Sequence, residues 1–404
     1  MNILYITMDG FDTASPNNQM AEQLIDGFLK LGHSVHLIQS ERKHEYDTLP
    51  ETLVGREGFT SDTLPRKVID KSDFVKRYFD EAKYSFQMIP YARKHRDCDV
   101  VFLQSCPTVF FQEVLLKLFV RKPVLYNVYD VWPGQTKSLN INKLVYMGMD
   151  LLSRLVYRMS SAVVVLSEDM VEACAEAGCP RKKLRVVPPW YDDRREYDIE
   201  WESNRFVEKF GISRDKFYVQ FAGSIGLQFN WRTMLEVARL LRDEPDIVIQ
   251  VVGDGCVKEQ FMEAVKEQGL SNVEFYPLQP VDMVPDVYSA GDICLIPLRR
   301  EVIYTGTPSK MPILLACGKA IVSSVEKDSL YAAMVERDDL GICVEIDNAE
   351  ELASAIKELH GDSSRLEHLR SHGRAYARKN LSRTVCVKEM ADVLTDIADG
   401  GGSR

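Results

Sequence analysis

The sequence predicts an α/β protein made of two doubly wound parallel sheets. Short runs of β-branched residues alternate with segments of helical periodicity, which is the pattern of a parallel sheet covered by helices. The alternation stops near residue 189 and restarts at residue 218. With 404 residues, the chain has room for two or three domains of about 100 to 200 residues each.

The first series of elements predicts an N-terminal domain at 1–189. Its elements are a strand at 3–7, a helix at 19–31 and strands at 34–38, 100–103, 124–128 and 162–166. An insertion at about 39–97 interrupts the series. It is rich in aromatic and basic residues, as in Lys76-Arg77-Tyr78-Phe79 and Arg93-Lys94-His95-Arg96.

The second series predicts a C-terminal domain at 205–380, after a polar linker at 190–204. Its strands are expected at 218–222, 247–252, 273–276, 293–297, 320–323 and 342–344, and its helices at 231–242, 257–268 and 308–316. A closing helix is expected at 381–398. Sheets of this kind bind ligands beyond the carboxyl ends of their strands, so we expect the functional residues there.

Composition excludes several classes of protein. A hydrophobic content of 45% and a charged content of 27% are those of a globular protein rather than a disordered chain. The net charge of −10 argues against a nucleic-acid binder. No stretch approaches the roughly 18 apolar residues of a membrane span. Met1 leads directly into a predicted strand without a charged leader, so we expect a cytoplasmic protein.

Cysteine and histidine residues predict no metal site. The nine cysteines are scattered and form no C-x-x-C pair, as expected of a reduced, cytosolic protein. His368 and His372 share a predicted helical face, but they lack the glutamate that follows the first histidine of a zinc protease. We expect them to be surface residues.

The segment 305–310 is the most informative part of the chain. Thr307 is a suitable helix N-cap and Pro308 a suitable first helical residue, so the spacing predicts a helix start. The free amides there, together with Lys310, would bind a phosphate. An ordinary capped helix with a solvated lysine explains the segment equally well, but Arg299 and Arg300 just upstream favour an anion site.

Two glycine turns follow successive predicted strands. The first is Gly223-Ser224-Ile225-Gly226 and the second is Gly253-Asp254-Gly255. Each alone is explained by a simple turn, but their repetition at successive strand ends indicates a place where backbone approaches a ligand. In the first domain, Asp130 follows a strand end, where it could orient a hydroxyl, act as a base or cap a turn.

Taken in order, these motifs resemble the retaining family 4 glycosyltransferases, and in particular the branch that builds bacterial O-antigen, capsule and exopolysaccharide. The resemblance covers nearly the whole chain. It rests on the glycine turns and on Asp130-Val131-Trp132-Pro133, Pro308-Ser309-Lys310 and Cys317-Gly318-Lys319-Ala320. It implies the GT-B fold, in which two Rossmann-like domains face each other across a cleft and the closing helix packs back on the N-terminal domain.

The resemblance also implies a mechanism. A UDP- or GDP-linked sugar would bind the second domain and a saccharide acceptor the first, with no metal ion and no other cofactor. Asp130 and Lys310 would be the catalytic residues. The residues that would hold the donor are Gly223, Ser224, Gly226, Gly253, Asp254, Gly255, Arg299, Thr305, Gly306, Thr307 and Ser309. Among them, the second glycine turn would lie nearer the nucleoside.

The sequence departs from the family pattern at several positions. The two glutamates of the family align with Thr305 and Ile313, and the second glutamate ordinarily binds the donor ribose. Ser15-Pro16-Asn17-Asn18 replaces a glycine-rich loop, and Tyr129 replaces a histidine that often precedes the aspartate. An active transferase remains the first interpretation. A non-catalytic partner subunit with a degenerate donor site is the alternative, and a sugar-nucleotide epimerase lacks its usual carboxylates and histidine here.

The same branch commonly uses undecaprenyl-diphosphate-linked acceptors at the inner leaflet of the membrane. Two segments could provide peripheral attachment, the basic and aromatic residues of 66–96 and the segment 114–122. A buried helix with a solvated rim explains the second segment equally well.

Overall fold

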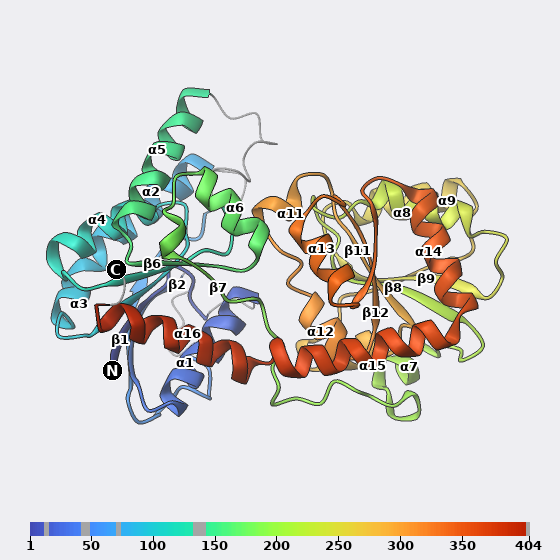
Figure 1. The fold of residues 1–404 in the computed structure, drawn as a ribbon, viewed down its shortest axis with the longest axis horizontal. Helices are drawn as coiled ribbons and strands as arrows, with labels where there is room; N and C mark the ends of the chain where they lie inside the picture. The colour runs from blue at the N-terminus through green and yellow to red at the C-terminus, as the bar shows by residue number, and fades with distance from the viewer. Residues whose placement is uncertain (12–15, 42–48, 70–73, 132–142, 401–404) are drawn as a thin grey trace. The chain divides into compact units, whose positions relative to one another are not determined.

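The computed structural model describes residues 1–11, 16–41, 49–69, 74–131 and 143–400 (Figure 1). The chain divides into two compact units. The first combines Met1–Pro188 with Arg383–Arg404, and the second is Pro189–Ser382. Each unit is built on its own parallel sheet, which confirms the predicted α/β class.

The sheet of the first unit has the order β3-β2-β1-β4-β5-β6-β7, and every pair of neighbours is parallel. Its strands are β1 (Asn2–Ile6), β2 (Ser34–Glu41), β3 (Phe59–Pro65), β4 (Val100–Gln104), β5 (Val124–Asn127), β6 (Ala162–Val165) and β7 (Leu184–Val186). The central strands are apolar and buried on both faces, as helices on both sides of the sheet require.

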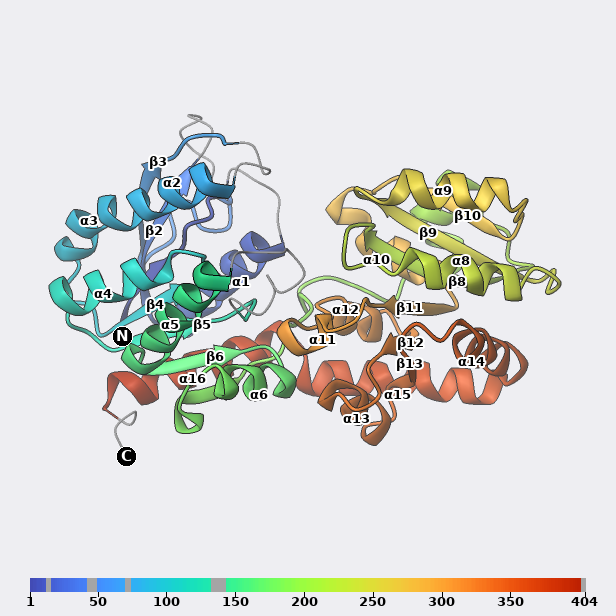
Figure 2. The ribbon, with the colours of Figure 1, turned by 90° about the horizontal axis from the view of Figure 1, so that it is seen from above.

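Helices cover both faces of this sheet (Figure 2). One face packs against α2 (Phe74–Gln87), α3 (Ile89–Lys94), α4 (Val109–Phe119), α5 (Lys143–Met159) and α6 (Glu168–Glu176). The other face carries α1 (Pro16–Lys30) and α16 (Arg383–Ala398). A buried ion pair between Arg383 and Asp26 joins these two helices. Gly27 lets them approach, because a Cβ atom there would lie 2.3 Å from Val387 Cγ1.

The second unit has a sheet of order β10-β9-β8-β11-β12-β13, again with every pair of neighbours parallel. Its strands are β8 (Phe217–Ser224), β9 (Ile247–Asp254), β10 (Val273–Tyr276), β11 (Ile293–Pro297), β12 (Ala320–Val325) and β13 (Gly341–Glu345). This is the strand order of a dinucleotide-binding fold.

Its helices also lie on both faces of the sheet. One core includes residues of α7 (Arg205–Phe210), α10 (Val284–Ser289), α12 (Met311–Ala316) and α13 (Leu330–Arg337). The opposite core includes residues of α8 (Trp231–Leu240), α9 (Lys258–Glu267), α14 (Ala349–Gly361) and α15 (Ser363–Asn380). The short α11 (Val302–Thr305) lies in the long connection between β11 and α12.

Two segments that were predicted to be a linker and an insertion are integral parts of the two units. The expected linker 190–204 is part of the second unit, where Tyr191 and Tyr197 are buried in an edge-on contact with ring centroids 5.3 Å apart. The insertion 39–97 supplies β3, α2 and α3 to the first unit. The helix expected at 381–398 is α16, and it is part of the first unit.

Candidate functional site

The carboxyl ends of β8, β9 and β11 bring the predicted glycines and lysine of the second unit together. The strands β8 and β11 are neighbours, but the sheet continues from β8 to β9 and from β11 to β12 in opposite directions. Such a divergence is where open α/β sheets bind their ligands. Gly223 and Ser224 end β8, in register with Gly253 and Asp254 at the end of β9.

Close backbone contacts require glycine at the ends of these strands. Gly253 has a φ of 146°, and a Cβ atom there would lie 1.9 Å from the carbonyl oxygen of Gly223. Gly255 has a φ of 158°, and its Cβ atom would lie 2.3 Å from the carbonyl oxygen of Ile225. Residues other than glycine rarely adopt such backbone angles. The two loops therefore pack backbone against backbone.

Hydrogen bonds hold the same two loops together. The Ile225 N–H donates to the Asp254 carbonyl at 2.9 Å, and the Val257 N–H donates to the Ile225 carbonyl at 3.2 Å. The Asp254 carboxylate accepts a hydrogen bond from the Gly255 N–H at 2.8 Å. One carboxylate oxygen of Asp254 is thus used within its own turn, although the side chain is exposed. Gly226 closes the first turn by accepting from the Phe229 N–H at 3.1 Å.

Lys310 lies directly against the first glycine turn. Its Nζ atom lies 4.1 Å from the centroid of the Phe221 ring, and a Cβ atom on Gly223 would lie 2.3 Å from Nζ. No carboxylate among the described residues forms an ion pair with Lys310. Burial lowers the pKa of the Lys310 ammonium group to about 8, although Cys294 acts in the opposite direction. The site thus contains a desolvated cation whose charge is balanced by no acidic side chain of the described residues.

The loop that precedes Lys310 differs from the predicted helix start. Helix α12 begins at Met311 rather than at Pro308, and Thr307 is not its N-cap. A start at Pro308 would place Pro312 inside the helix, where its ring would clash with the Pro308 carbonyl group and its N–H would be missing. With the start at Met311, Pro312 occupies the first turn, which proline tolerates.

The residues before α12 form a short helix and an extended segment. Thr305 ends α11, and Gly306 is extended with a φ of −154°. The Gly306 N–H donates to the Val302 carbonyl at 3.1 Å, and the Met311 N–H donates to the Pro308 carbonyl at 3.1 Å. Within the part of the chain that the structure describes, the backbone N–H groups of Ser309 and Lys310 have no hydrogen-bond acceptor. They are available to a ligand or to water.

The two arginines upstream have different surroundings. Arg299 donates from its guanidinium group to the Leu227 carbonyl at 3.2 Å, which ties it to the loop after β8. Arg300 pairs with Asp347 at 2.6 Å and is exposed. Arg299 therefore lies beside the glycine turn, and Arg300 is paired with a carboxylate.

In the first unit, polar groups gather after β5. Asn127 ends the strand, and Tyr129 and Asp130 follow it. Asn127 and Tyr129 are buried, and the Asn127 side chain interacts with the Tyr129 hydroxyl group. The Tyr129 N–H donates to Ser105 Oγ at 3.2 Å. Trp132 and Pro133 of the predicted motif lie outside the described residues, as does Ser15.

Comparison with known families decides the identity of this arrangement. The family model described as glycosyl transferase 4-like domain matches residues 18–190, and the model described as glycosyl transferases group 1 matches residues 216–362. The chain belongs to family 4 of the glycosyltransferases. The two models cover most of both units of this family 4 glycosyltransferase, one model for each unit.

Individual relatives agree with this assignment. WcaI of Escherichia coli K12, described as a colanic acid biosynthesis glycosyl transferase, is 26% identical over 198 residues, or 48% of each chain. WbjE of Pseudomonas aeruginosa, described as a glycosyltransferase, is 21% identical over 235 residues, which are 57% of this chain and 58% of WbjE. The chain therefore spans about half the length of these relatives.

Solved structures show the fold. The crystal structure of Anabaena HepE in complex with UDP superposes with a TM-score of 0.75 at 14% identity, over 98% of this chain and 100% of HepE. The family 4 glycosyltransferase described here therefore has the GT-B fold, as the motifs predicted.

The two positions at which the family has glutamate hold other residues in this chain. Ile313, at the second glutamate position, is partly buried and packs against the core that includes α12. Thr305, at the first, ends α11. An apolar side chain that packs on a core makes no polar contact to a ribose.

The segments considered for membrane contact differ in exposure. Arg66 is buried and pairs with Asp80 at 3.0 Å, so it does not face a lipid surface. Exposed apolar side chains instead lie at Phe79 and Phe86 on α2 and at Leu118 and Phe119 on α4. A further exposed apolar row, which was not predicted, lies on α5 and consists of Leu144, Met147, Leu151 and Leu155. These residues are spaced three or four apart, which places them on one helical face, and this spacing could have predicted the row from the sequence. Among the described residues, no helix is both long enough and apolar enough to cross a bilayer.

Proposed function

We propose that this chain is a retaining glycosyltransferase that transfers a sugar from a nucleotide-diphosphate sugar to a saccharide acceptor in the synthesis of a bacterial surface polysaccharide. The observation that carries the proposal is the position of Lys310, whose charge no carboxylate balances, against the Gly223 turn at a strand-end divergence. The description of WcaI and the UDP bound to HepE support the same reaction class.

The donor diphosphate fits the surroundings of Lys310. Its charge would be balanced by the Lys310 ammonium group, and its oxygens would accept hydrogen bonds from the backbone N–H groups of Ser309 and Lys310. The side chains of Thr305, Thr307 and Arg299 and the backbone of Gly306 are further candidates for this role. The glycines of the second turn would allow the nucleoside to lie close to the backbone of β9.

The chemistry needs little from the protein beyond position and charge. The bond between the anomeric carbon and the phosphate oxygen breaks, and the acceptor oxygen bonds to the anomeric carbon from the same face. The acceptor proton passes to an oxygen of the departing β-phosphate. Lys310 would stabilise the charge that accumulates on the diphosphate, and this transfer requires no metal ion.

The acceptor belongs to the first unit in this proposal. Asp130 would orient its hydroxyl group, and the buried polar groups of Asn127 and Tyr129 would supply hydrogen bonds nearby. We propose an undecaprenyl-diphosphate-linked saccharide as acceptor and a cytoplasmic location at the inner leaflet. The exposed apolar row on α5 and the phenylalanines of α2 support attachment to a lipid surface.

Ile313 supports a second candidate function. If the ribose requires the missing glutamate, the protein would be a non-catalytic partner of another glycosyltransferase. Nucleotide binding separates the two functions, because a degenerate donor site would bind no nucleotide diphosphate.

Isothermal titration with UDP, GDP, ADP and CMP tests the proposed function. We expect a clear preference for UDP or GDP and a loss of about 10- to 100-fold in affinity in Lys310→Ala, as for other hydrogen bonds to charged groups. Lys357→Ala is the matched control, since Lys357 pairs with Glu244 in the same unit and should not affect binding. Absence of binding by all four nucleotides would favour the non-catalytic partner.

Membrane attachment is tested separately by co-sedimentation with anionic liposomes at low salt. The wild type should sediment with the vesicles, and the double variant Leu144→Ser/Leu151→Ser should remain in solution. Sedimentation that is unchanged in this variant would exclude α5 as the contact.

A further inference from the structure

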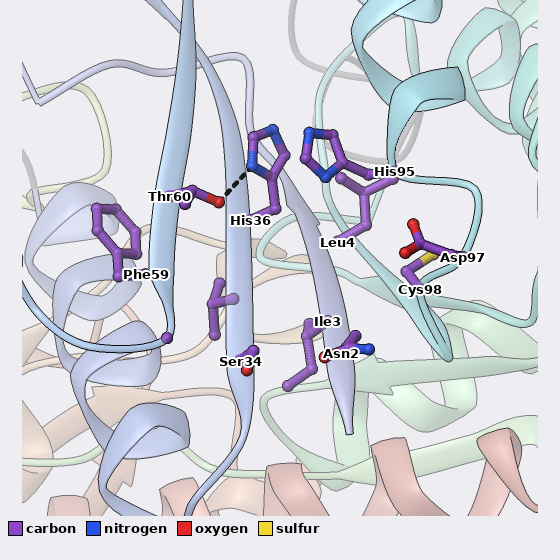
Figure 3. A pocket seen from close by; sticks show the side chains of 12 residues that line it. Asn2, Ile3, Leu4, Ser34, His36, Phe59, Thr60, His95, Asp97 and Cys98 are labelled. Carbon is purple, nitrogen blue, oxygen red and sulfur yellow. Dashed lines mark hydrogen bonds between the residues drawn. The ribbon is translucent and has the colours of Figure 1, made fainter.

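A cavity of about 320 Å³ lies at the amino ends of β1, β2 and β3 in the first unit (Figure 3). It is at the edge of the sheet opposite to the carboxyl ends, where ligands of this fold bind. Its lining includes His36, Thr60, His95 and Cys98. The acceptor and donor roles proposed above leave these residues without a function.

Three potential metal ligands converge beside this cavity from three different elements. His36 lies on β2, Asp62 on β3 and His95 immediately after α3. One ligand atom from each side chain lies within 4.8 Å of the other two. The imidazole rings of His36 and His95 are stacked with their centroids 3.4 Å apart. Figure 3 shows the two rings beside each other.

We propose that His36, Asp62 and His95 bind one Zn²⁺ ion. Two imidazole nitrogens and one carboxylate oxygen form a donor set that zinc prefers, and a water molecule would complete a tetrahedron. Zinc–ligand distances of about 2.0–2.1 Å place the ligands of a tetrahedral site roughly 3.3 Å apart. The distance between His36 Nε2 and Asp62 Oδ2 is 3.1 Å, which already matches that spacing.

The surroundings of His36 suit a metal ligand. Its Nδ1 atom lies 2.7 Å from Thr60 Oγ1. A threonine hydroxyl group can accept a hydrogen bond from Nδ1–H, which leaves Nε2 with a free electron pair for the ion, the usual arrangement of metal-binding histidines.

Metal binding requires one rearrangement. Two parallel stacked rings cannot direct their nitrogen electron pairs at one ion, so the His95 ring must turn out of its stack on His36. His95 is half-buried at the end of a short helix, and its side chain lines the cavity. The cavity offers the ion access and a place for the water ligand.

The bound ion would connect parts of the first unit and would take no part in the sugar transfer. It would connect β2, the edge strand β3 and the end of α3, and the last two of these belong to the insertion 39–97. The sugar transfer proposed above needs no metal, and this site lies at the other edge of the sheet. Zinc would therefore stabilise the first unit without taking part in the transfer.

Zinc titration of the metal-free full-length protein tests this proposal. We expect one Zn²⁺ per chain, with affinity at least about 100-fold weaker in His36→Gln, Asp62→Asn and His95→Gln, since even residues that only support a ligand change affinity by about 10- to 100-fold. Thr60→Val should fall in that smaller range. Zinc should raise the melting temperature of the wild type but not of His95→Gln.

The control is the double variant His368→Gln/His372→Gln on α15, where His368 contacts Asp339 at 2.6 Å. It should bind zinc like the wild type. His95→Gln is the variant that should still fold, because position 95 is only half-buried and follows the end of a helix. The metal-free melting curve of this variant should match that of the wild type. Absence of stoichiometric binding, or binding that survives in both His36→Gln and His95→Gln, would overturn the proposal.

Discussion

The ammonium group of Lys310 fills the space in front of Gly223. A Cβ atom on residue 223 would lie 2.3 Å from Lys310 Nζ and 2.5 Å from Cε. The lysine can therefore reach this position only because residue 223, next to the last residue of β8, is glycine. This contact links the loop before α12 to the end of β8 in the second unit.

Gly223→Ala should abolish nucleotide binding while the protein still folds. The new methyl group would displace Lys310, and the φ of 138° at residue 223 is unfavourable for alanine. Such backbone strain costs about 1–3 kcal/mol. Nucleotide titration and thermal melting of the variant measure the two effects. Gly361→Ala, at an open position without positive φ, should leave both unchanged, and an unaltered nucleotide affinity in Gly223→Ala would contradict the role of Lys310.

The pH dependence of donor use should follow Lys310. Its pKa of about 8 means that the ammonium group is charged at pH 7 and neutral well above pH 8. Since kcat/KM reports the free enzyme, kcat/KM for the donor should fall as pH rises through about 8. Lys310→Arg should abolish this fall, because arginine stays charged. A wild-type profile that remains level to high pH would show that another group balances the diphosphate.

Ile313→Ala should affect stability rather than the donor. Ile313 packs against the core of the second unit and is only partly buried. We expect a loss of about 1–2 kcal/mol, below the 2–5 kcal/mol of fully buried positions. Urea denaturation measures this loss, and nucleotide affinity should remain within about twofold, a change well below 1.4 kcal/mol. A large loss of affinity at unchanged stability would instead give Ile313 a place in the donor site.

Glu113→Gln should remove a pH dependence of stability. Glu113 on α4 is buried, and burial raises its pKa to about 7, although Lys117 and Lys183 act in the opposite direction. The unfolded carboxyl group loses its proton near its ordinary pKa of 4.5, so rising pH between 4.5 and 7 favours unfolding. Above pH 7 the variant should be more stable than the wild type by roughly 2–3 kcal/mol, and at pH 4.5 the two should be similar. Parallel urea denaturation curves at several pH values test this.

The sheets were predictable where their strands are buried on both faces. The runs that became β4, β8 and β11 are mostly apolar and buried, and they lie within one or two residues of the predicted bounds. The edge strand β3 was missed because its sequence FTSDTLP is mostly polar and only one of its side chains is buried. An edge strand that faces solvent lacks the apolar pattern from which strands are predicted.

The residues of the candidate site could be predicted from the sequence, but their arrangement in space could not. Glycines at the ends of β8 and β9 could be named because the turn chemistry is local. The start of α12 was placed too early because Thr307 and Pro308 fit a helix start, whereas Pro312 decides between the two possible starts. The cluster of His36, Asp62 and His95 follows no short spacing, since it depends on strand register and on the end of a helix.

The return of α16 to the first unit has a consequence for synthesis. Residues 189–382 emerge from the ribosome as one uninterrupted stretch, whereas the first unit lacks a helix until residues 383–398 have been made. Until then, the surface around Asp26 and Gly27 is without the buried side chains of α16, among them Cys386, Val387 and Leu394. A prematurely terminated chain would therefore carry an open apolar surface on its first unit. Exposed apolar surface of this kind is what chaperones and proteases recognise in incompletely folded chains.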